Sequence, residues 1–169
     1  TSILSQLYEQ VVGVKPTEII ELPASGSNRR YFRLLGTKSL IGVLGTCKEE
    51  NESFIYLANH FKERNLPVPK VLAVAEDCMA YVQEDLGDDI LFKAIEKGRL
   101  TRSFSNEEKE LLIKTIRMLP DVQFAGAVGL DFSKCYPLAE FDTRTIMWDL
   151  NYFKYCFLKA TGLEFQEDL

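Results

Sequence analysis

Histidine is almost absent from this sequence of 169 residues, and closely spaced cysteines are lacking, which argues against a metal centre. There is one histidine, and none of the four cysteines stands in the CxxC spacing that zinc sites use. The cysteines are Cys47, Cys78, Cys135 and Cys156. We therefore expect no metal-ligating residues in the chain and interpret the cysteines as small, mostly buried thiols.

Long apolar runs and clusters of basic residues are absent as well. No stretch reaches the roughly 18 consecutive apolar residues that a membrane span requires, and residues 1–14 lack the positively charged start of a secretory signal. The net charge is −5 and no basic stripe stands out, which disfavours nucleic acid and anionic membranes as partners. We interpret the chain as a cytoplasmic protein that binds neither.

The first half of the sequence alternates between helical and strand patterns. A hydrophobic fraction of 46% suffices for a packed core. Apolar residues recur at helical spacing over residues 2–13 and 54–61. Short runs of strand character lie between turn residues at 18–22, 30–35, 39–44, 71–75 and 79–83. We predict an α+β fold with a five-stranded antiparallel sheet, and a second helix that begins with a capping box of Thr46 and Glu49.

The second half of the sequence is helical in character. Residues 85–89 are acidic, contain a glycine and predict a hinge. We expect a helix at 90–97 closed by Gly98, a second helix capped by Ser105 and Glu108, and a long helix at about 138–160. The second helix is expected to turn these residues inward: Leu111, Leu112, Thr115, Ile116 and Leu119. The long helix carries an aromatic cluster: Trp148, Tyr152, Phe153, Tyr155 and Phe157.

Two segments are candidates for ligand binding. The first is the turn of small and polar residues at 24–30, which can bring backbone N–H groups close to an anion. The same composition is typical of an ordinary hairpin turn. The second is the apolar strand at 79–83 that runs into residues 84–87, where exposed backbone groups could contact the edge of a purine. The alternative for this second segment is a plain linker between two domains.

Several stretches together resemble a known superfamily. They are ASGSNRRYFRL, SLIGVLG, NESFIYLANHF, LPVPKVLAV and YVQEDLGDDIL, and they resemble the aminoglycoside phosphotransferase and choline kinase superfamily. The similarity is greatest to its cell-wall-sugar branch, the anomeric N-acetylmuramate and N-acetylglucosamine kinases. It covers essentially all of the chain, and RRYFRL, LPVP and EDLGD in this order are its most specific part. The resemblance implies a protein-kinase-like small lobe at 1–84, a hinge at 85–89 and the first helices of the large lobe at 90–169.

The resemblance also implies roles for particular positions. The phosphate-covering loop would be formed by Ser25, Gly26, Ser27, Asn28 and Arg29. Adenine would meet the backbone of Gln83, Glu84 and Asp85 and would be walled by Ile41, Val43 and Val82. Glu52 would be the acidic partner of a lysine on the third strand. The intact enzyme would use ATP and Mg²⁺ to phosphorylate a hydroxyl of a small polar acceptor: a sugar first, then an aminoglycoside, then a choline-like alcohol.

This sequence departs from the kinase pattern in its charged residues. Leucine occupies position 44, where kinases carry the third-strand lysine. Lys48, Arg29 or Arg30 could supply that charge instead, and without it Glu52 could be a solvated helix residue. The catalytic H/R-x-D motif followed by asparagine is missing. The one histidine, His60, falls inside a predicted helix and is expected at the surface or its boundary.

These departures lead to a specific expectation for the chain. We interpret it as the N-terminal fragment of an ATP-dependent phosphotransferase, a truncated form or a proteolytic product, with no catalytic residue of its own, no activity and no tightly bound cofactor. The aromatic helix would pack against the remainder of the large lobe, and its exposure in a fragment would promote self-association. The alternative is a complete, non-catalytic module that binds a nucleotide or another protein.

Overall fold

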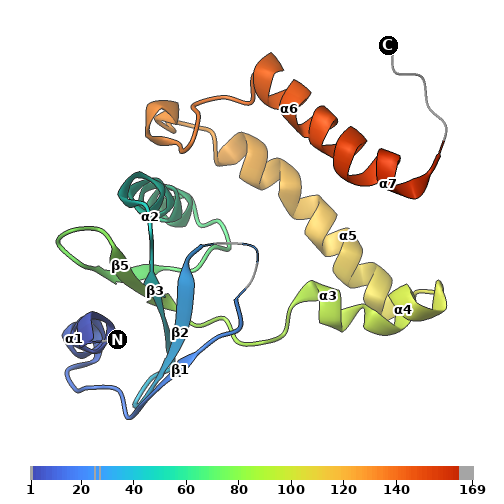
Figure 1. Ribbon diagram of the computed structural model, residues 1–169. Coiled ribbons are helices and arrows are strands. Elements are labelled where there is room, and N and C mark those ends of the chain that lie inside the picture. Colours follow the sequence, from blue (N-terminus) through green and yellow to red (C-terminus); the bar gives the residue numbers. More distant parts are fainter. Residues whose placement is uncertain (1, 25, 27, 164–169) are drawn as a thin grey trace. The chain divides into compact units, whose positions relative to one another are not determined.

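The computed structural model describes residues 2–24, 26 and 28–163 (Figure 1). The chain divides into two compact units, residues 1–136 and 137–169, and each is described by itself. The predicted hinge at 85–89 lies inside the first unit, so the division into lobes at that point stays a prediction.

The first unit is built on a five-stranded antiparallel sheet, which confirms the predicted α+β class. Its strands are β1 (Glu18–Glu21), β2 (Arg30–Leu35), β3 (Leu40–Leu44), β4 (Val71–Val74) and β5 (Ala80–Glu84). The spatial order is β1-β2-β3-β5-β4, and every neighbouring pair is antiparallel. All five strands fall within about a residue of their predicted positions, because alternating β-branched and aromatic residues between turns are a strong strand signal.

One face of the sheet is covered by the first helix, α1 (Ser2–Val12), as its apolar periodicity predicts. Leu4, Leu7 and Tyr8 of this helix are almost fully buried. They pack with Phe32, Leu34, Leu40, Ala73, Ala80 and Val82 of the sheet. The Tyr8 hydroxyl donates to the Lys38 carbonyl at 2.7 Å, so the buried phenol keeps a polar partner. This face is therefore a closed core.

The opposite face is partly covered by α2 (Lys48–Glu63). Phe54 and Ile55 pack on a cluster formed by Ile41, Val43 and Tyr81, and the rings of Phe54 and Tyr81 stack with centroids 5.2 Å apart. The predicted capping box at the start of α2 is wrong. The N-cap is Cys47, and its thiol donates to the Glu49 carboxylate instead of to a backbone group.

Helices follow the sheet in the first unit: α3 (Leu91–Ala94), α4 (Glu96–Thr101), α5 (Asn106–Pro120), the π-helix η1 (Asp121–Ala125) and the 3₁₀-helix η2 (Phe132–Lys134). The capping box of Ser105 and Glu108 is confirmed, with both reciprocal hydrogen bonds present. The prediction that Gly98 closes a helix is wrong, because Gly98 lies within α4. A Cβ there would come within 2.2 Å of the Phe104 ring, so this position needs glycine for close packing.

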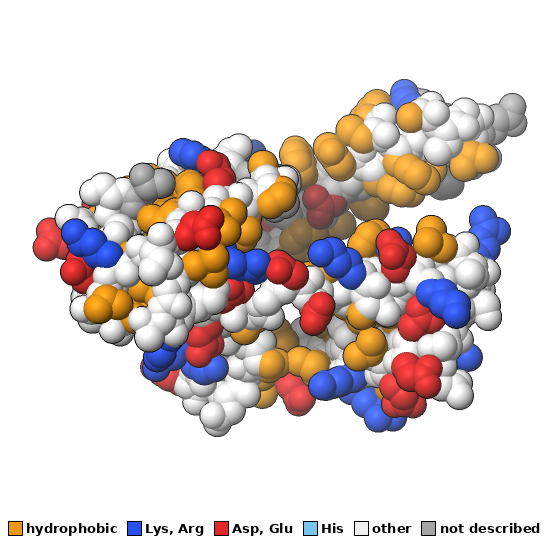
Figure 2. Space-filling view, turned by 90° about the horizontal axis from the view of Figure 1, so that it is seen from below, with side chains coloured by type: hydrophobic (Ala, Val, Ile, Leu, Met, Phe, Trp, Pro, Cys, Tyr) orange, Lys and Arg blue, Asp and Glu red, His pale blue; other side chains and the backbone are white. Residues whose placement is uncertain are grey.

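The apolar stripe of α5 does not face inward in this structure, contrary to the prediction. Leu111, Ile116 and Leu119 are 40%, 63% and 51% exposed, Thr115 is exposed and Leu112 is half-buried. Helical periodicity marks a face suited to contact, but it does not say whether the same chain supplies the contact. Hydrophobic side chains lie open on the surface in Figure 2.

The second unit is a single helical run made of α6 (Thr143–Phe153), the π-helix η3 (Lys154–Leu158) and α7 (Lys159–Thr161). It begins at Thr143 and not near residue 138 because the Asp142 carboxylate caps the Thr145 amide at 2.8 Å. Gly162 ends it with φ of +69°, as predicted. Its aromatic residues are exposed and stack in pairs, Trp148 on Tyr152 and Phe153 on Phe157.

Two further expectations about single residues are wrong. His60 is buried at 6% exposure, with Nε2 hydrogen-bonded to the Gly126 carbonyl at 2.8 Å. The free cysteines are half-buried or, for Cys156, exposed, so they are not core thiols. None of the helices described here combines the length and apolar character needed to cross a membrane.

Candidate functional site

The face of the sheet that α2 covers only in part holds most of the predicted site residues. Its cross-strand rows run from β2 through β3 to β5: Val43 lies between Tyr31 and Tyr81, and Ile41 lies between Arg33 and Gln83. Helix α2 covers the β5 side of this face. On the β1 side Ile20 is 41% exposed and Tyr31 is half-buried. We call the side formed by Ile20, Leu22, Tyr31, Arg33 and Ile41 the candidate face.

The two candidate binding segments lie at opposite ends of the candidate face. Arg30, which follows the polar turn, pairs with Leu44, whereas Leu40 pairs with Glu84, which precedes the acidic segment. The strands between these ends span about 20 Å at 3.3 Å per residue. A ligand that touched both segments would therefore have to be elongated and lie along β2 and β3.

In the polar turn, Gly26 and Asn28 are exposed, and Ser25 and Ser27 lie outside the described residues. Among the turn residues that the structure describes, Arg29 points into the protein, with a side chain only 10% exposed. Its Nη2 donates to the Glu50 carboxylate at 3.0 Å and to the Glu50 carbonyl at 3.3 Å. The guanidinium also lies over the Phe54 ring, 5.3 Å from its centroid. The turn is thereby held against the start of α2.

The three basic residues considered as substitutes for the missing lysine have different environments. Arg30 pairs with Glu21 at 2.8 Å, and Lys48 pairs with Glu52 at 3.6 Å, and all four of these side chains are at least half exposed. Arg29 is the buried one. The acidic residue of α2 that meets the inward cation is therefore Glu50, and Glu52 takes the role of a solvated helix residue.

Glu52 instead lines a separate hollow of about 400 Å³ on the first unit. The hollow lies between α2 and the segment at 133–136, with Glu49, Ser53 and Tyr56 on its helical side. The Ser53 hydroxyl accepts from the Tyr136 amide at 3.0 Å, which joins the two sides. No sequence signal indicated this hollow, since its two sides are about 80 residues apart.

Two polar atoms near the candidate face are buried without a hydrogen-bond partner among the described residues. They are the Tyr81 hydroxyl and the Oε1 atom of Gln83. Burial raises the pKa of Tyr81, against a smaller lowering by the nearby Arg29 charge, so the phenol stays protonated. A buried polar atom without a partner costs free energy, so each of the two calls for a structural or functional reason.

The predicted adenine wall is only partly brought together. Ile41 and Val43 share the face that α2 contacts, whereas Val82 is fully buried on the opposite face with α1. Val82 pairs with Gly42, one residue out of phase with the other two. Since side chains alternate between faces along a strand, the three cannot line one pocket. Whether Ile41 and Val43 contact a base stays a prediction.

Of the three residues whose backbone is predicted to contact adenine, two lie within the sheet. Gln83 and Glu84 belong to β5, an interior strand between β3 and β4. The Glu84 amide donates to the Lys70 carbonyl at 3.0 Å, and its carboxylate accepts from the Lys70 amide at 2.9 Å. The first backbone outside the sheet is that of Asp85. We call residues 85–88 the connector.

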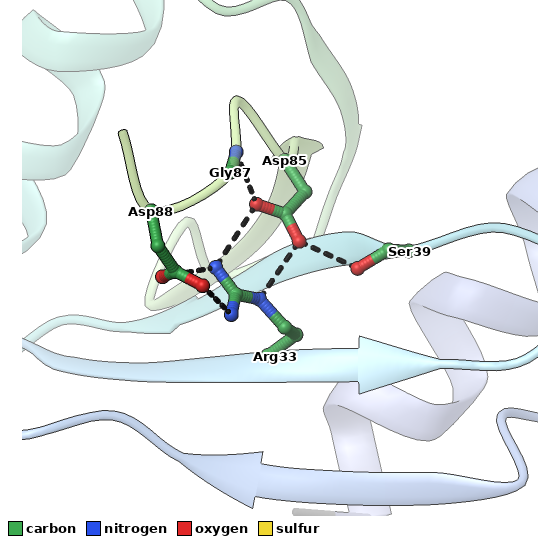
Figure 3. Close-up of polar contacts among 5 residues, drawn as sticks. All are labelled: Arg33, Ser39, Asp85, Gly87 and Asp88. Atoms are coloured by element: carbon green, nitrogen blue, oxygen red, sulfur yellow. Dashed lines mark hydrogen bonds and ion pairs between the residues drawn. The ribbon is translucent and has the colours of Figure 1, made fainter. Parts of the chain in front are cut away.

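The connector is tied to the candidate face through Arg33 (Figure 3). The Arg33 guanidinium contacts the carboxylates of Asp85 and Asp88 with two nitrogen–oxygen contacts each, at 2.8 to 3.3 Å. The Ser39 hydroxyl donates to Asp85 at 2.5 Å, and the Gly87 amide donates to it at 2.9 Å. We call these five residues the connector cluster. The sequence did not indicate it, because its members are up to 55 residues apart.

The connector cluster shifts the acidity of both carboxyl groups. Burial by itself raises the pKa of Asp85, but hydrogen bonds from Ser39, Gly87 and Arg33 outweigh it and lower that pKa below its ordinary value. The hydrogen bonds and charge of Arg33 lower the pKa of Asp88. The same two carboxylates raise the pKa of Arg33. All three groups are therefore charged at neutral pH.

No family model matches the chain. Its similarity to known proteins includes ephrin type-A receptor 4-B and ephrin type-A receptor 4-A of Xenopus laevis, each 38% identical over 77 residues. The match covers 41% of this chain and 8% of each receptor. Because so small a share of either receptor is matched, activity, substrates and partners of this chain remain proposals.

Proposed function

We propose that this chain is the nucleotide-binding part of an ATP-dependent phosphotransferase that acts on a hydroxyl of a small polar molecule, with a sugar as the first choice of acceptor. The observation that carries the proposal is the arrangement on one sheet. A polar turn and an acidic connector stand at the two ends of a half-exposed face. The helix that follows β3 and precedes β4 in the chain, α2, packs on part of that face. This arrangement is compatible with the small lobe of a protein-kinase-like fold.

In this proposal the nucleotide lies along β2 and β3. The base meets the connector backbone from Asp85 onward and rests near Ile41, and the phosphates meet the backbone amides of the turn at Gly26 and Asn28. Arg29, held by Glu50, supplies the positive charge near the phosphates that Leu44 cannot supply. Mg²⁺ would come with the nucleotide, and the chain alone is expected to bind ATP weakly without transferring its phosphoryl group.

Titration of the ¹⁵N-labelled chain with Mg·ATP tests the proposal. We expect amide shifts to change at Gly26, Asn28, Ile41 and Gly87. Amides on the α1 face, such as that of Leu34, should stay unchanged. Titration with Mg·GTP separates adenine recognition from general phosphate binding.

The matched variants are Ile20→Glu, which places a carboxylate on the exposed part of the candidate face, and Gln10→Glu, which makes the same charge change at an exposed position of α1. Ile20→Glu should weaken ATP binding about ten-fold or more through repulsion of the nucleotide, and Gln10→Glu should leave it unchanged. Absence of any shift at millimolar ATP, or shifts confined to the α1 face, would overturn the proposal.

A second candidate function has one observation in its favour. Trp148 is 67% and Tyr152 is 61% exposed, and the two rings stack on the surface of α6. Aromatic residues exposed together are enriched at protein–protein contacts. A non-catalytic protein-interaction module would use this helix to bind its partner. This hypothesis predicts that ATP has no effect on partner binding.

A further inference from the structure

Arg33 joins two sequence motifs that no proposed ligand contact explains. It is the third arginine of the RRYFRL stretch and lies on β2, and its partners Asp85 and Asp88 are the two aspartates of EDLGD that flank Leu86 and Gly87. The motifs are about 50 residues apart in the chain but adjacent in the structure (Figure 3). The contact between them is therefore a product of the fold and not of local sequence.

This contact uses four of the five N–H groups of Arg33. Nε and Nη2 hold the two oxygens of Asp85, while Nη1 and Nη2 hold those of Asp88. A guanidinium has five N–H groups in a fixed plane, and paired nitrogen–oxygen contacts of this kind restrict both partners in orientation. Arg33 is thus committed to the connector and is not the cation that would hold a phosphate.

The connector has a backbone conformation that needs support. Gly87 has φ of +81°, in the region that favours glycine, and its amide donates back to the Asp85 carboxylate. The Asp85 side chain is only 8% exposed and also accepts from Ser39. Asp85 therefore fixes the turn from within, while Arg33 fixes Asp85 from the sheet.

We propose that Arg33 is the positioning residue of the connector: through Asp85 and Asp88 it keeps residues 85–88 in one turn against the β2–β3 hairpin. A consequence of this positioning role rests on the proposed function. The ordered connector presents its backbone to the nucleotide base, so a loosened connector weakens ATP binding without changing the phosphate contacts.

The test is amide hydrogen exchange of the full chain, with Arg33→Met and Arg33→Lys beside the unaltered protein. Methionine retains much of the side-chain volume but no charge, and lysine keeps the charge but lacks the planar fork that makes two paired contacts with each carboxylate. We expect exchange at Gly87 and its neighbours to become about ten-fold faster or more in Arg33→Met and to be partly restored in Arg33→Lys. Amides at the centre of the sheet, such as Val43 and Tyr81, should exchange as before.

Arg30→Met is the matched control. It removes an arginine from the same strand together with its two contacts to Glu21, far from the connector. Exchange at Gly87 should not change. If Arg33→Met unfolds the chain, Asp88→Asn and Ser39→Ala each remove one side of the cluster and should give smaller accelerations confined to 85–89.

The results separate the two levels of the proposal. Unchanged exchange at Gly87 in Arg33→Met, or exchange in the unaltered protein as fast as in an unfolded peptide, would overturn the positioning role. A loosened connector with unaltered ATP affinity would overturn only its effect on the ligand. If the unaltered chain binds no ATP, the proposed function fails, whereas the exchange result still decides whether Arg33 orders the connector.

Discussion

Gly45 and Asn51 are so close that a Cβ added at position 45 would lie 2.0 Å from the Asn51 Nδ2 atom. Asn51 is fully buried, and its Nδ2 donates to the Cys78 carbonyl at 2.9 Å, so it cannot move aside without losing that bond. The Gly45 amide in turn donates to the Met79 carbonyl. These contacts join the end of β3, the first turn of α2 and the turn before β5, and so fix how α2 enters the sheet.

Gly45→Ala should therefore destabilise the first unit. The methyl group would push Asn51 off its bond in a site without free space, which costs about 1–3 kcal/mol, as is typical of overpacking. Chemical denaturation followed by far-UV circular dichroism measures the change. Gly26→Ala is the control, because nothing lies within 4 Å of a Cβ there, and it should change stability by less than about 0.5 kcal/mol. Equal stability of the two variants would show that Asn51 can rearrange freely.

Arg29 is expected to hold the polar turn to α2. Arg29→Met removes a charged donor from a nearly buried position and leaves the Glu50 carboxylate without this partner, at a cost of about 1–2 kcal/mol. A double-mutant cycle with Glu50→Gln measures the coupling between the two side chains. Arg30→Met, which breaks a pair between two exposed side chains, should have no measurable effect. Equal effects at positions 29 and 30 would contradict the assignment of Arg29 as the inward cation.

The strands were predictable from the sequence, but the residues that join distant segments were not. Turn residues and alternating side chains located all five strands within about a residue. They did not give the register, and the register decides which face each side chain occupies. The resemblance grouped Val82 with Ile41 and Val43, although its pairing with Gly42 places it on the α1 face. Once β3 and β5 are aligned, the alternation of side chains settles the question.

The candidate site was only partly predictable for a related reason. Composition identified the polar turn and the acidic connector, because small and acidic residues leave a local signal. Arg33 gave no such signal: an arginine within an alternating strand looks like a solvent-facing residue. Its role depends on a partner 52 residues away, which only the three-dimensional structure reveals. The same limit explains why Glu52 was predicted to meet the cation that Glu50 contacts. The two residues are two positions apart on one helix and face different surroundings.

Acid should loosen the connector cluster at a pH set by its carboxyl groups. The pKa values of Asp85 and Asp88 are lowered in the folded state from an ordinary value of 3.8. A lowered folded pKa gives stability that is fully present above the unfolded pKa and is lost as pH falls through the folded pKa. The contribution is thus constant from neutral pH to about pH 5, begins to fall near pH 4, and is lost as pH drops through the lowered pKa values of the folded state.

Denaturation midpoints of the unaltered chain and of Asp85→Asn, measured between pH 3 and pH 7, test this dependence. Asparagine has no charge to lose, so Asp85→Asn should be the less stable protein at pH 7, and the gap should close as pH falls below about 4. A gap that stays constant down to pH 3 would mean that the charge of Asp85 does not contribute to stability. Glu9→Gln, which removes a carboxylate from an exposed position of α1, provides the control for charge removal alone.

The exposed aromatic pair on α6 should make the chain self-associate. The described residues of the second unit include none that is buried, so its helix has little apolar contact of its own. Contact between the exposed, stacked rings and a second apolar surface removes apolar area from water, which is favourable. Sedimentation velocity at increasing concentration should show a dimer or larger species for the unaltered chain. Trp148→Glu should shift the distribution to the monomer, because it adds a charge and removes the largest exposed ring. Gln10→Glu makes the same charge change on α1 and should leave the association as it was. A strictly monomeric unaltered chain at about 100 µM, where a half-populated dimer has an association free energy of about −5.5 kcal/mol, would contradict this prediction.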